Sequence, residues 1–402
     1  MLKSIKNQPL VYVFISSFLV LFVGMGLFPI LPLYATRFGA SKTMVGVYYA
    51  VMYVANATGS MLPAWLGARL SNRAMFVSGS LVGLPALFLL GKATSLFQVV
   101  LLTSLLWFSG GLLMALVNVF TGMYASSQRR GASFSIMSLP LPFGALIGSA
   151  VVGRLVTWQG YPSMFMVLGA LWICLPLIGV FLLREKQSVS PKTLSDQEPA
   201  IQTRFTSSFY LLLGLTLVST LAVNAGRLGT SLSMQTLNFS PADIASSATV
   251  SALVTIPLTL LIGTLSDRMG RERLLVGGYL LSAAGALTLV FATQLWQFWL
   301  AASCLLVSLS ASGALAFALA TDLLSGPGLS RGLSWMKGMG AMASVISFAS
   351  TGLFLDTLGP IALYLAAMIL PVAAAYVLEA VGCKPKRFVP VPAGIRNDFF
   401  CM

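Results

Sequence analysis

The chain contains no histidine and few acidic residues. Its 402 residues include ten Asp and Glu, and none of these precedes Glu185. Without histidine, the chain lacks the side chain that most often shuttles protons near neutral pH and most often binds metals. The acid-free first half has no carboxylate to balance a cationic ligand. An enzyme, which needs clustered acids, bases or nucleophiles, is therefore not expected.

Charged residues and cysteines are scarce throughout the chain. Asp, Glu, Lys and Arg together make up 8% of it, against about 25% in a typical soluble domain. The four cysteines stand at spacings that fit neither a metal site nor a disulfide framework. The chain also lacks a phosphate-binding loop of the Gly-x-x-x-x-Gly-Lys-Ser kind, so ATP is not expected to drive any activity. We therefore expect no cofactor and no metal.

Apolar residues are in large excess and form 57% of the chain. They fall into twelve runs, each long enough to cross about 30 Å of hydrocarbon at about 1.5 Å per residue. The runs cover residues 10–35, 43–66, 74–91, 96–121, 133–155, 162–183, 208–236, 243–265, 273–292, 297–321, 333–355 and 360–381. This pattern predicts an all-α integral membrane protein with twelve transmembrane helices in a lipid bilayer.

One long polar stretch divides the twelve runs into two sets of six. It covers residues 184–207 and is rich in charged residues and proline, which is typical of a linker. The sequence predicts four parts: an N-terminal six-helix bundle at 1–183, a cytoplasmic linker at 184–207, a C-terminal six-helix bundle at 208–381 and a cytoplasmic tail at 382–402.

The basic residues between the runs predict how the chain crosses the membrane. With both termini in the cytoplasm, 19 of the 24 lysines and arginines lie on the inner side. The outer side then holds Arg37, Lys42, Lys92 and Arg154, while Arg227 remains inside a run. This bias follows the positive-inside rule and predicts a multi-pass protein of the plasma membrane, the inner membrane of a bacterium. It also accounts for the net charge of +14 without nucleic acid as a partner.

The two sets of runs repeat each other at an offset of about 200 residues. Phe38–Ser41 after the first run aligns with Asn238–Pro241 after the seventh. Arg130–Gly131 before the fifth run aligns with Arg331–Gly332 before the eleventh. Together these matches predict two pseudo-symmetric halves related by an axis along the membrane normal.

The most specific motif is Gly263–Arg273, which reads Gly-x-Leu-x-Asp-Arg-x-Gly-Arg-x-Arg. We interpret it as a tight, charged turn between two apolar runs, and such a turn lies at a membrane face because it cannot sit in lipid. The pattern resembles the signature loop of major facilitator superfamily transporters, and an ordinary polar turn of another polytopic protein is the alternative. The resemblance covers about residues 10–381 and implies two halves that rock about a central site. It further implies a latch between the halves at the cytoplasmic face, formed by Asp267, Arg268, Gly270 and Arg271.

Two other segments indicate the branch of this family. Pro29–Tyr34 has a Pro-x-x-Pro-x-Tyr pattern that resembles the drug-efflux branch. Gly144–Gly153 resembles the antiporter motif, although Ser149 and Val152 replace a proline and a glycine. We expect a monomeric secondary transporter that moves a small organic molecule by alternating access, with efflux as the direction. Uptake or uniport of a neutral or anionic metabolite is the alternative, and a membrane scaffold without transport is a remote one.

Four residues near the middle of their runs are candidates for substrate binding, namely Arg227, Asn224, Asn56 and Trp107. A charge at the depth of Arg227 costs about 2.5 kcal/mol or more, so it is expected to face a cavity or a partner. The alternatives are that Arg227 snorkels or pairs with Asp243 or Asp356, that the asparagines only join helices, and that Trp107 only packs.

Proton coupling stays open, because the acids of the second half lie near the ends of their runs. Three alternatives remain. Protons move through an acid near the end of a helix, such as Asp322, or transport is not coupled to protons, or the substrate carries its own proton. Arg227 and the acid-free first half also indicate a neutral, zwitterionic or anionic substrate rather than a lipophilic cation, because like charges repel in a low-dielectric cavity.

Overall fold

The computed structural model describes residues 8–67, 69–124, 136–137, 139–181, 205–324 and 327–381. Most of these residues are helical, and none of them forms a strand. The predicted linker, apart from its last residues, and the whole predicted tail lie outside the described residues.

The helices follow the apolar runs closely. The first half consists of α1 (Gln8–Leu27), α2 (Leu31–Thr36), α3 (Lys42–Leu66), α4 (Asn72–Leu90), α5 (Leu96–Tyr124), α7 (Pro140–Trp172) and α8 (Cys174–Phe181). The second half consists of α9 (Ser207–Thr236), α10 (Pro241–Met269), α11 (Arg271–Val290), α12 (Leu295–Leu323), α13 (Pro327–Thr357) and α14 (Gly359–Val381).

The predicted fold class is confirmed. Ten helical stretches among the described residues are long and apolar enough to cross a membrane. One of them, Pro140–Phe181, has 42 residues and changes direction at Gly160, so that it supplies two of the predicted spans. The less apolar α3, with 25 residues, runs beside them and completes the twelve.

Proline and glycine set the breaks between helices. The first predicted span is split after Leu27, because Pro29 and Pro32 lack the N–H groups that would continue the helical ladder. Gly160 and Gly270 have φ angles of 80° and 89°, which glycine adopts without the steric cost that other residues meet. The charged turn predicted over Gly263–Arg273 is therefore much shorter than expected: α10 continues to Met269, and Gly270 alone separates it from α11.

Serine caps start two equivalent helices at the same end of the molecule. The Ser41 hydroxyl accepts a hydrogen bond from the Met44 N–H and begins α3. Ser240 and Asp243 form a capping box that begins α10. These two caps lie in the segments that the sequence repeat aligned.

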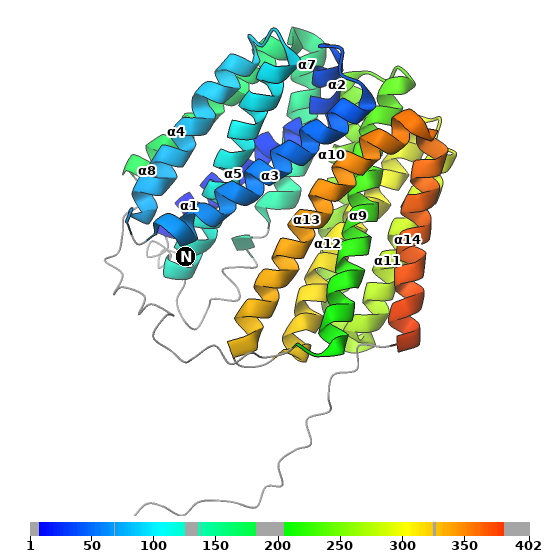
Figure 1. Ribbon diagram of the computed structural model, residues 1–402. Coiled ribbons are helices and arrows are strands. Elements are labelled where there is room, and N and C mark those ends of the chain that lie inside the picture. The colour runs from blue at the N-terminus through cyan, green and yellow to red at the C-terminus, as the bar shows by residue number, and fades with distance from the viewer. Residues whose placement is uncertain are drawn as a thin grey trace, which may run out of the picture.

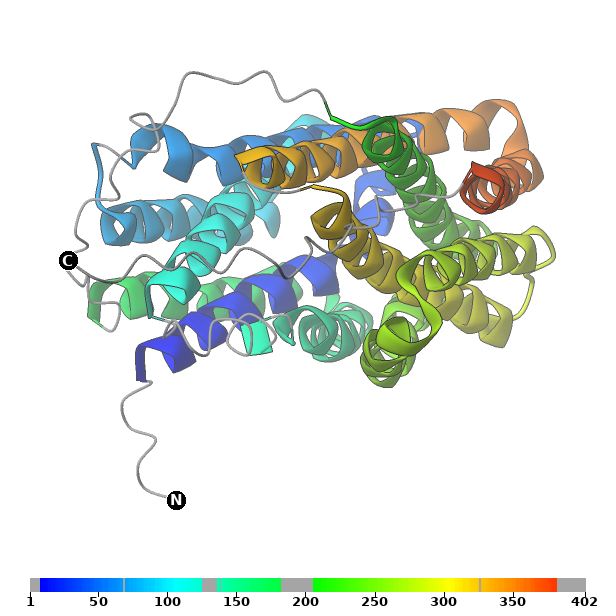
Figure 2. The same cartoon turned by 90° about the horizontal axis from the view of Figure 1, so that it is seen from below.

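The two halves meet through two pairs of helices, α3 with α13 and α7 with α10. These pairs are related by the repeat, since each joins the second membrane span of one half to the fifth membrane span of the other. In Figure 1 the halves converge at the top and diverge toward the bottom, where α1 begins and α14 ends. We call the bottom of this view the termini end and the top of this view the far end. Figure 2 shows the halves side by side from the termini end.

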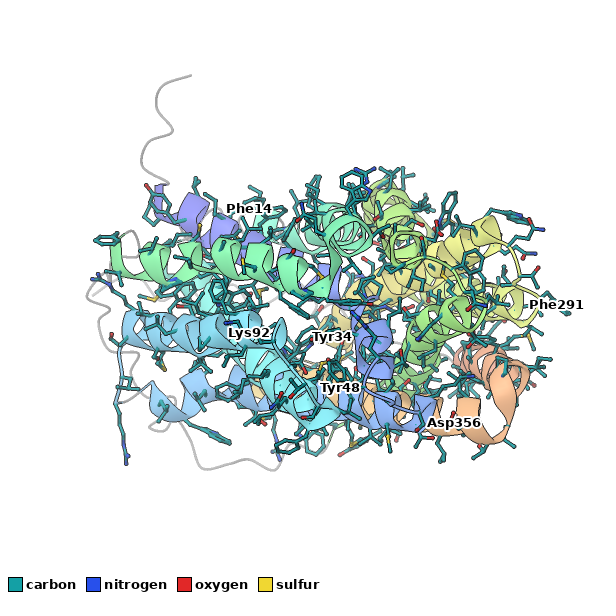
Figure 3. All side chains as sticks on the ribbon, turned by 90° about the horizontal axis from the view of Figure 1, so that it is seen from above. Phe14, Tyr34, Tyr48, Lys92, Phe291 and Asp356 are labelled. Atoms are coloured by element: carbon teal, nitrogen blue, oxygen red, sulfur yellow. The ribbon has the colours of Figure 1, made fainter. Side chains whose placement is uncertain are left out.

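Close helix contacts hold the far end together. A Cβ at Gly46 of α3 would lie 2.5 Å from the Phe348 carbonyl oxygen of α13, so only glycine permits this approach. A Cβ at Gly153 of α7 would likewise clash with the Ala245 side chain of α10. Seen from the far end, Tyr34 and Tyr48 lie near the centre of the molecule, whereas Phe291 lies at its edge (Figure 3). Large apolar side chains such as Leu253 and Ile369 are exposed on the outside, as a lipid-facing surface requires.

Candidate functional site

Arg227 lies on α9 where the two halves meet. It is nine residues before the end of the helix at Thr236, which corresponds to roughly 14 Å at 1.5 Å per residue. Its guanidinium carbon stands 4.3 Å from the centre of the Phe28 ring, which belongs to the break between α1 and α2. This distance is within the range of a cation–π interaction. The side chain thus joins the second half to the first.

An aromatic cluster of the first half surrounds this contact. Tyr49 and Tyr53 of α3 stand beside the ring of Phe348 on α13, at centroid distances of 5.5 Å and 4.7 Å. The ring of Phe28 packs edge-on against Tyr49 at 5.2 Å. The hydroxyl of Tyr53 also interacts with the Arg227 guanidinium. The Phe28 ring therefore covers the guanidinium on the side of the first half and is itself packed against Tyr49.

A cavity of about 60 Å³ opens beside Arg227 and is lined by both halves. One water needs about 10–15 Å³ by this measure, so the cavity has room for a small polar group. Its polar wall is formed by α9 and α10, through Arg227, Thr230, Ser231, Ser247 and Ser251. Its apolar wall is formed by the first half and α12, through Met25, Phe28, Pro29, Ala145, Ala302 and Leu306.

Asn224 supports Arg227 from one helical turn away. Its side-chain oxygen is 3.5 Å from an Arg227 Nη atom, and its amide nitrogen donates to the Ser344 hydroxyl of α13 at 2.9 Å. Asn224 is 3% exposed and does not line the cavity directly. Two of the predicted site residues, Arg227 and Asn224, are thus brought together.

Asn56 and Trp107 lie together, but in a different place. The Asn56 amide donates to the backbone carbonyl of Trp107 at 3.1 Å and joins α3 to α5 within the first half. A Cβ at Gly59 or Gly111 would meet the backbone of the facing helix at this crossing. Neither Asn56 nor Trp107 is among the cavity residues. This geometry matches the alternative in which Asn56 joins helices and Trp107 packs.

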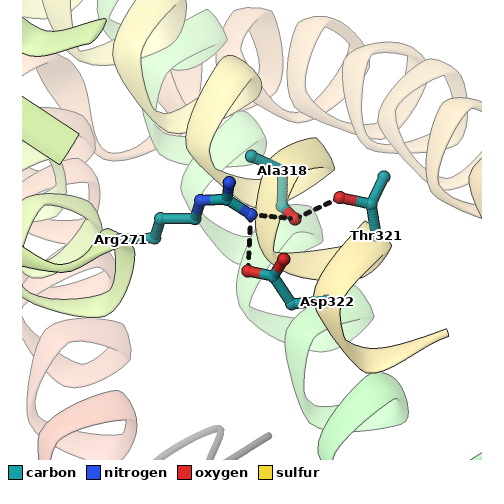
Figure 4. Close-up of polar contacts among 4 residues, drawn as sticks. All are labelled: Arg271, Ala318, Thr321 and Asp322. Carbon is teal, nitrogen blue, oxygen red and sulfur yellow. Dashed lines mark hydrogen bonds and ion pairs between the residues drawn. The ribbon is translucent and has the colours of Figure 1, made fainter. Parts of the chain in front are cut away.

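The predicted latch is described only in part. The side chains of Asp267 and Arg268 lie outside the described residues. Arg271 forms an ion pair with Asp322 of α12 at 2.5 Å and donates to the Ala318 carbonyl at 2.9 Å (Figure 4). Both partners belong to its own half, and among the described residues Arg271 makes no recorded contact with the first half. Figure 1 shows the halves diverging at this end.

The described carboxylates that were candidate partners of Arg227 are engaged elsewhere. Asp243 accepts from the Ser240 hydroxyl at 2.7 Å and from its backbone N–H at 3.2 Å. Asp356 accepts from the backbone N–H and the hydroxyl of Thr43 at 2.7 Å and 2.6 Å. The alternative in which Arg227 pairs with either acid is therefore not seen among the described residues. Asp322, a candidate proton carrier, is ion-paired with Arg271.

The sequence pattern does not single out several residues of this site. Ser247 and Ser251 follow each other at four-residue spacing on α10, a pattern that could have marked one polar face. Phe28 directly precedes Pro29, the first residue of the Pro-x-x-Pro-x-Tyr pattern. Phe348 is an apolar residue in an apolar helix, so its sequence context carries no signal.

Two six-helix halves that meet around a small polar cavity, with closer contact at one end than at the other, are the arrangement found in transporters that work by alternating access. The family model of the Major Facilitator Superfamily matches residues 13–226 and 212–388. The chain belongs to this superfamily and is a multi-pass membrane transporter rather than an enzyme.

Curated relatives match about two thirds of the chain. The chain is 25% identical over 287 residues to the multidrug resistance protein MdtG of Enterobacter lignolyticus, and the match covers 68% of each chain. It is 25% identical over 284 residues to MdtG of Salmonella arizonae, with 67% of this chain and 69% of the relative covered.

Solved structures share the fold at lower identity. The peptide transporter POT in complex with sulfate has a TM-score of 0.75 and 14% identity, covering 94% of this chain and 95% of that chain. A mutant of the nucleoside transporter NupG has a TM-score of 0.74 and 12% identity, covering 93% of this chain and all of that chain.

Proposed function

We propose that this protein is an exporter of small organic molecules in the inner membrane of a bacterium, and that the cavity beside Arg227 is its substrate site. The observation that carries the proposal is the position of Arg227. It is a charged residue in a membrane-spanning helix, held against the first half by Phe28 and lining a cavity that both halves form. A charge at such a depth is a functional group in most membrane proteins.

The arrangement of the halves supports alternating access. Their close contacts lie at the far end, through α3 with α13 and α7 with α10, while the halves diverge at the termini end. With both termini in the cytoplasm, as the basic residues predict, this is a state whose cytoplasmic end is open. The two bundles predicted at 1–183 and 208–381 are the bodies that would rock about the cavity.

Relatives named for multidrug resistance support export as the direction. The Pro-x-x-Pro-x-Tyr pattern at Pro29–Tyr34 also supports export, because it resembles the drug-efflux branch. The same pattern forms the break that places Phe28 against Arg227.

The proposal is tested with the purified protein in liposomes of known orientation. A panel of small labelled compounds is offered with and without a pH gradient, and each is followed in wild type and in Arg227→Gln. Arg154→Gln is the matched control, because Arg154 is exposed and lies away from the cavity. We expect at least one compound to accumulate in inside-out vesicles and this accumulation to be lost in Arg227→Gln alone. Accumulation only in right-side-out vesicles would replace export by uptake. No movement of any compound would favour a scaffold.

A further inference from the structure

Arg227 carries a positive charge that no described acid neutralises. The acids nearest to it by helix position, Asp243 and Asp356, are bound to Ser240 and Thr43. The first half contributes none, because the chain has no acidic residue before Glu185. An unpaired charge inside a membrane protein is unfavourable unless a partner compensates it.

The neighbours of Arg227 use only part of its hydrogen-bonding capacity. A guanidinium has five N–H donors in one plane. Asn224 accepts one of them at the long distance of 3.5 Å, the Tyr53 hydroxyl contacts the group, and Phe28 covers one face of the plane. All three neighbours are neutral. The remaining donors can meet a ligand in the cavity that Arg227 lines.

A serine lies on the same face of α9 as Arg227. Ser231 lies one turn after Arg227 on α9 and lines the same cavity. Ser247 and Ser251 line it from α10. Their hydroxyls donate to backbone carbonyls of their own helix, Ser247 to Ile244 and Ser251 to Ala248. The polar wall therefore combines one cation with neutral hydroxyls and no acid among the described residues.

We infer that the cavity binds an anion, and that the transported compound is amphipathic with a single compact anionic group such as a carboxylate. This inference rests on the proposed function and assigns the substrate class of the same site. The anionic group binds the Arg227 guanidinium and the Ser231 hydroxyl. The apolar body lies against the opposite wall, which Met25, Phe28 and Leu306 form. The volume of about 60 Å³ is enough for a head group of a few heavy atoms.

This arrangement selects by charge. A cation would bring a second positive charge beside Arg227 in a medium of low dielectric constant. A neutral compound of the same shape would leave the guanidinium unpaired. A planar carboxylate can accept two parallel hydrogen bonds from the guanidinium, which a lysine cannot provide. Hydrogen bonds to charged groups correspond to a preference of about tenfold or more for the anion over its neutral isostere.

The test uses three probes of nearly identical shape: benzoate, benzamide and benzamidine, which are anionic, neutral and cationic. Thermal unfolding of the purified protein in detergent reports binding, because a ligand that binds the folded state raises the melting temperature with its concentration. Wild type is compared with Arg227→Gln, Arg227→Lys and the control Arg154→Gln. Transport of the same probes into proteoliposomes is measured in parallel.

We expect benzoate to bind wild type and Arg154→Gln at least about ten times more tightly than benzamide does, and benzamidine to bind least. Arg227→Gln is expected to lose this preference, and Arg227→Lys to keep part of it. Equal binding of benzamidine, or an anion preference that persists in Arg227→Gln, would overturn the inference. Equal stabilisation by sodium chloride and sodium benzoate would also overturn it, because the site would then hold only an inorganic counter-ion. Anion binding without transport of any compound would instead count against the proposed function, so the two failures are distinguishable.

Discussion

Asp356 of α13 caps the first turn of α3 across the interface between the halves. One carboxylate oxygen accepts from the Thr43 backbone N–H at 2.7 Å and from the Thr43 hydroxyl at 2.6 Å. The first N–H groups of a helix have no partner within the helix and carry partial positive charge. At the equivalent position of α10, Asp243 caps its own helix. The interface of α3 with α13 is therefore joined by a carboxylate that caps a helix of the other half. In the related interface of α7 with α10, the capping carboxylate stays within its own helix.

Replacing Asp356 with Asn is expected to loosen the far end. The amide keeps one acceptor but loses the charge that favours the N-terminus of α3. Because Asp356 is exposed, the contact weakens by about 0.5–1 kcal/mol. This corresponds to a shift of about 2- to 5-fold toward states with the far end open. The measurement is the distance distribution between spin labels at Lys92 and Phe291, in a protein whose native cysteines are replaced.

Asp243→Asn is the matched control for this change, because it removes the same charge from a cap that stays within one helix. We expect its label distances to match those of the wild-type protein. Equal distances in Asp356→Asn and the parent would show that the carboxylate does not hold the far end closed.

The sequence predicts the helices well because each span is encoded locally. Apolar runs set their lengths, and residues such as Pro29 and Gly160 set their breaks. The pairing of Asp356 with Thr43 joins residues 313 positions apart, and no local pattern records it. The short turn at Gly270 also escaped prediction, because charged residues such as Arg271 can extend a helix beyond the membrane as readily as form a loop.

The candidate site was predictable only where a residue broke the apolar pattern. Arg227 and Asn224 do so, and the structure places the Asn224 Oδ1 atom 3.5 Å from an Arg227 Nη atom. Asn56 does so too, yet it joins α3 to α5. A polar residue in a membrane helix has two common uses, and only the position of the neighbouring helices separates them.

The close approach of α3 and α13 makes a second prediction. A Cβ at Gly352 would clash with the Lys42 carbonyl, whereas one at Gly340 of the same helix meets nothing within 4 Å. Gly352→Ala should therefore separate the helices at the far end, with an overpacking cost of about 1–3 kcal/mol. Hydrogen exchange of the first turns of α3, followed by mass spectrometry, should be faster than in Gly340→Ala. Identical exchange in the two variants would mean that α3 adjusts without opening.

One face of α13 lines an open cavity, and it predicts how the halves meet when the far end is open. Toward the termini end, Arg331, Trp335, Gly338 and Met342 line a cavity of about 420 Å³. Thr43 contacts Asp356 and Tyr53 contacts Phe348, so α3 and α13 run antiparallel. When this register is continued toward the termini end, Met61 is expected to lie opposite Gly338. Met61 is 51% exposed in this structure. We expect α3 to close on this face when the far end opens.

Cysteines at Met61 and Gly338 test this register. A protease site in the predicted linker allows the halves to be separated unless a cross-link joins them. The yield of the cross-link should be low in the parent protein and should rise when Asp356→Asn is added. The pair of Met61 with Lys337, which lies about 100° around the helix from Gly338, should remain unlinked. Equal yields for both pairs would rule out the predicted register.

Asp267→Asn is expected to impair transport while leaving membrane insertion intact. The resemblance of Gly263–Arg273 to the family loop assigns this carboxylate to a contact with the first half in the state whose cytoplasmic end is closed. Gly67 stands at the equivalent position of the first half, so no second acid replaces it. Initial transport rates and the amount of protein in the membrane are measured together. Initial transport rates equal to those of the wild type would show that the motif only sets the topology of the chain in the membrane.

The two asparagines should give opposite results when each is replaced by alanine. Asn224 contacts Arg227 and Ser344, so Asn224→Ala removes a contact that positions the guanidinium. The apparent KM for a transported compound should rise by about fivefold, which is equivalent to the loss of one hydrogen bond of about 1 kcal/mol. Asn56 contacts the Trp107 carbonyl within the first half, so Asn56→Ala should lower the melting temperature and leave that KM unchanged. Each variant serves as the control of the other, because both remove one amide from a helix crossing. A raised KM in Asn56→Ala with an unchanged KM in Asn224→Ala would move the substrate site from α9 to the crossing of α3 and α5.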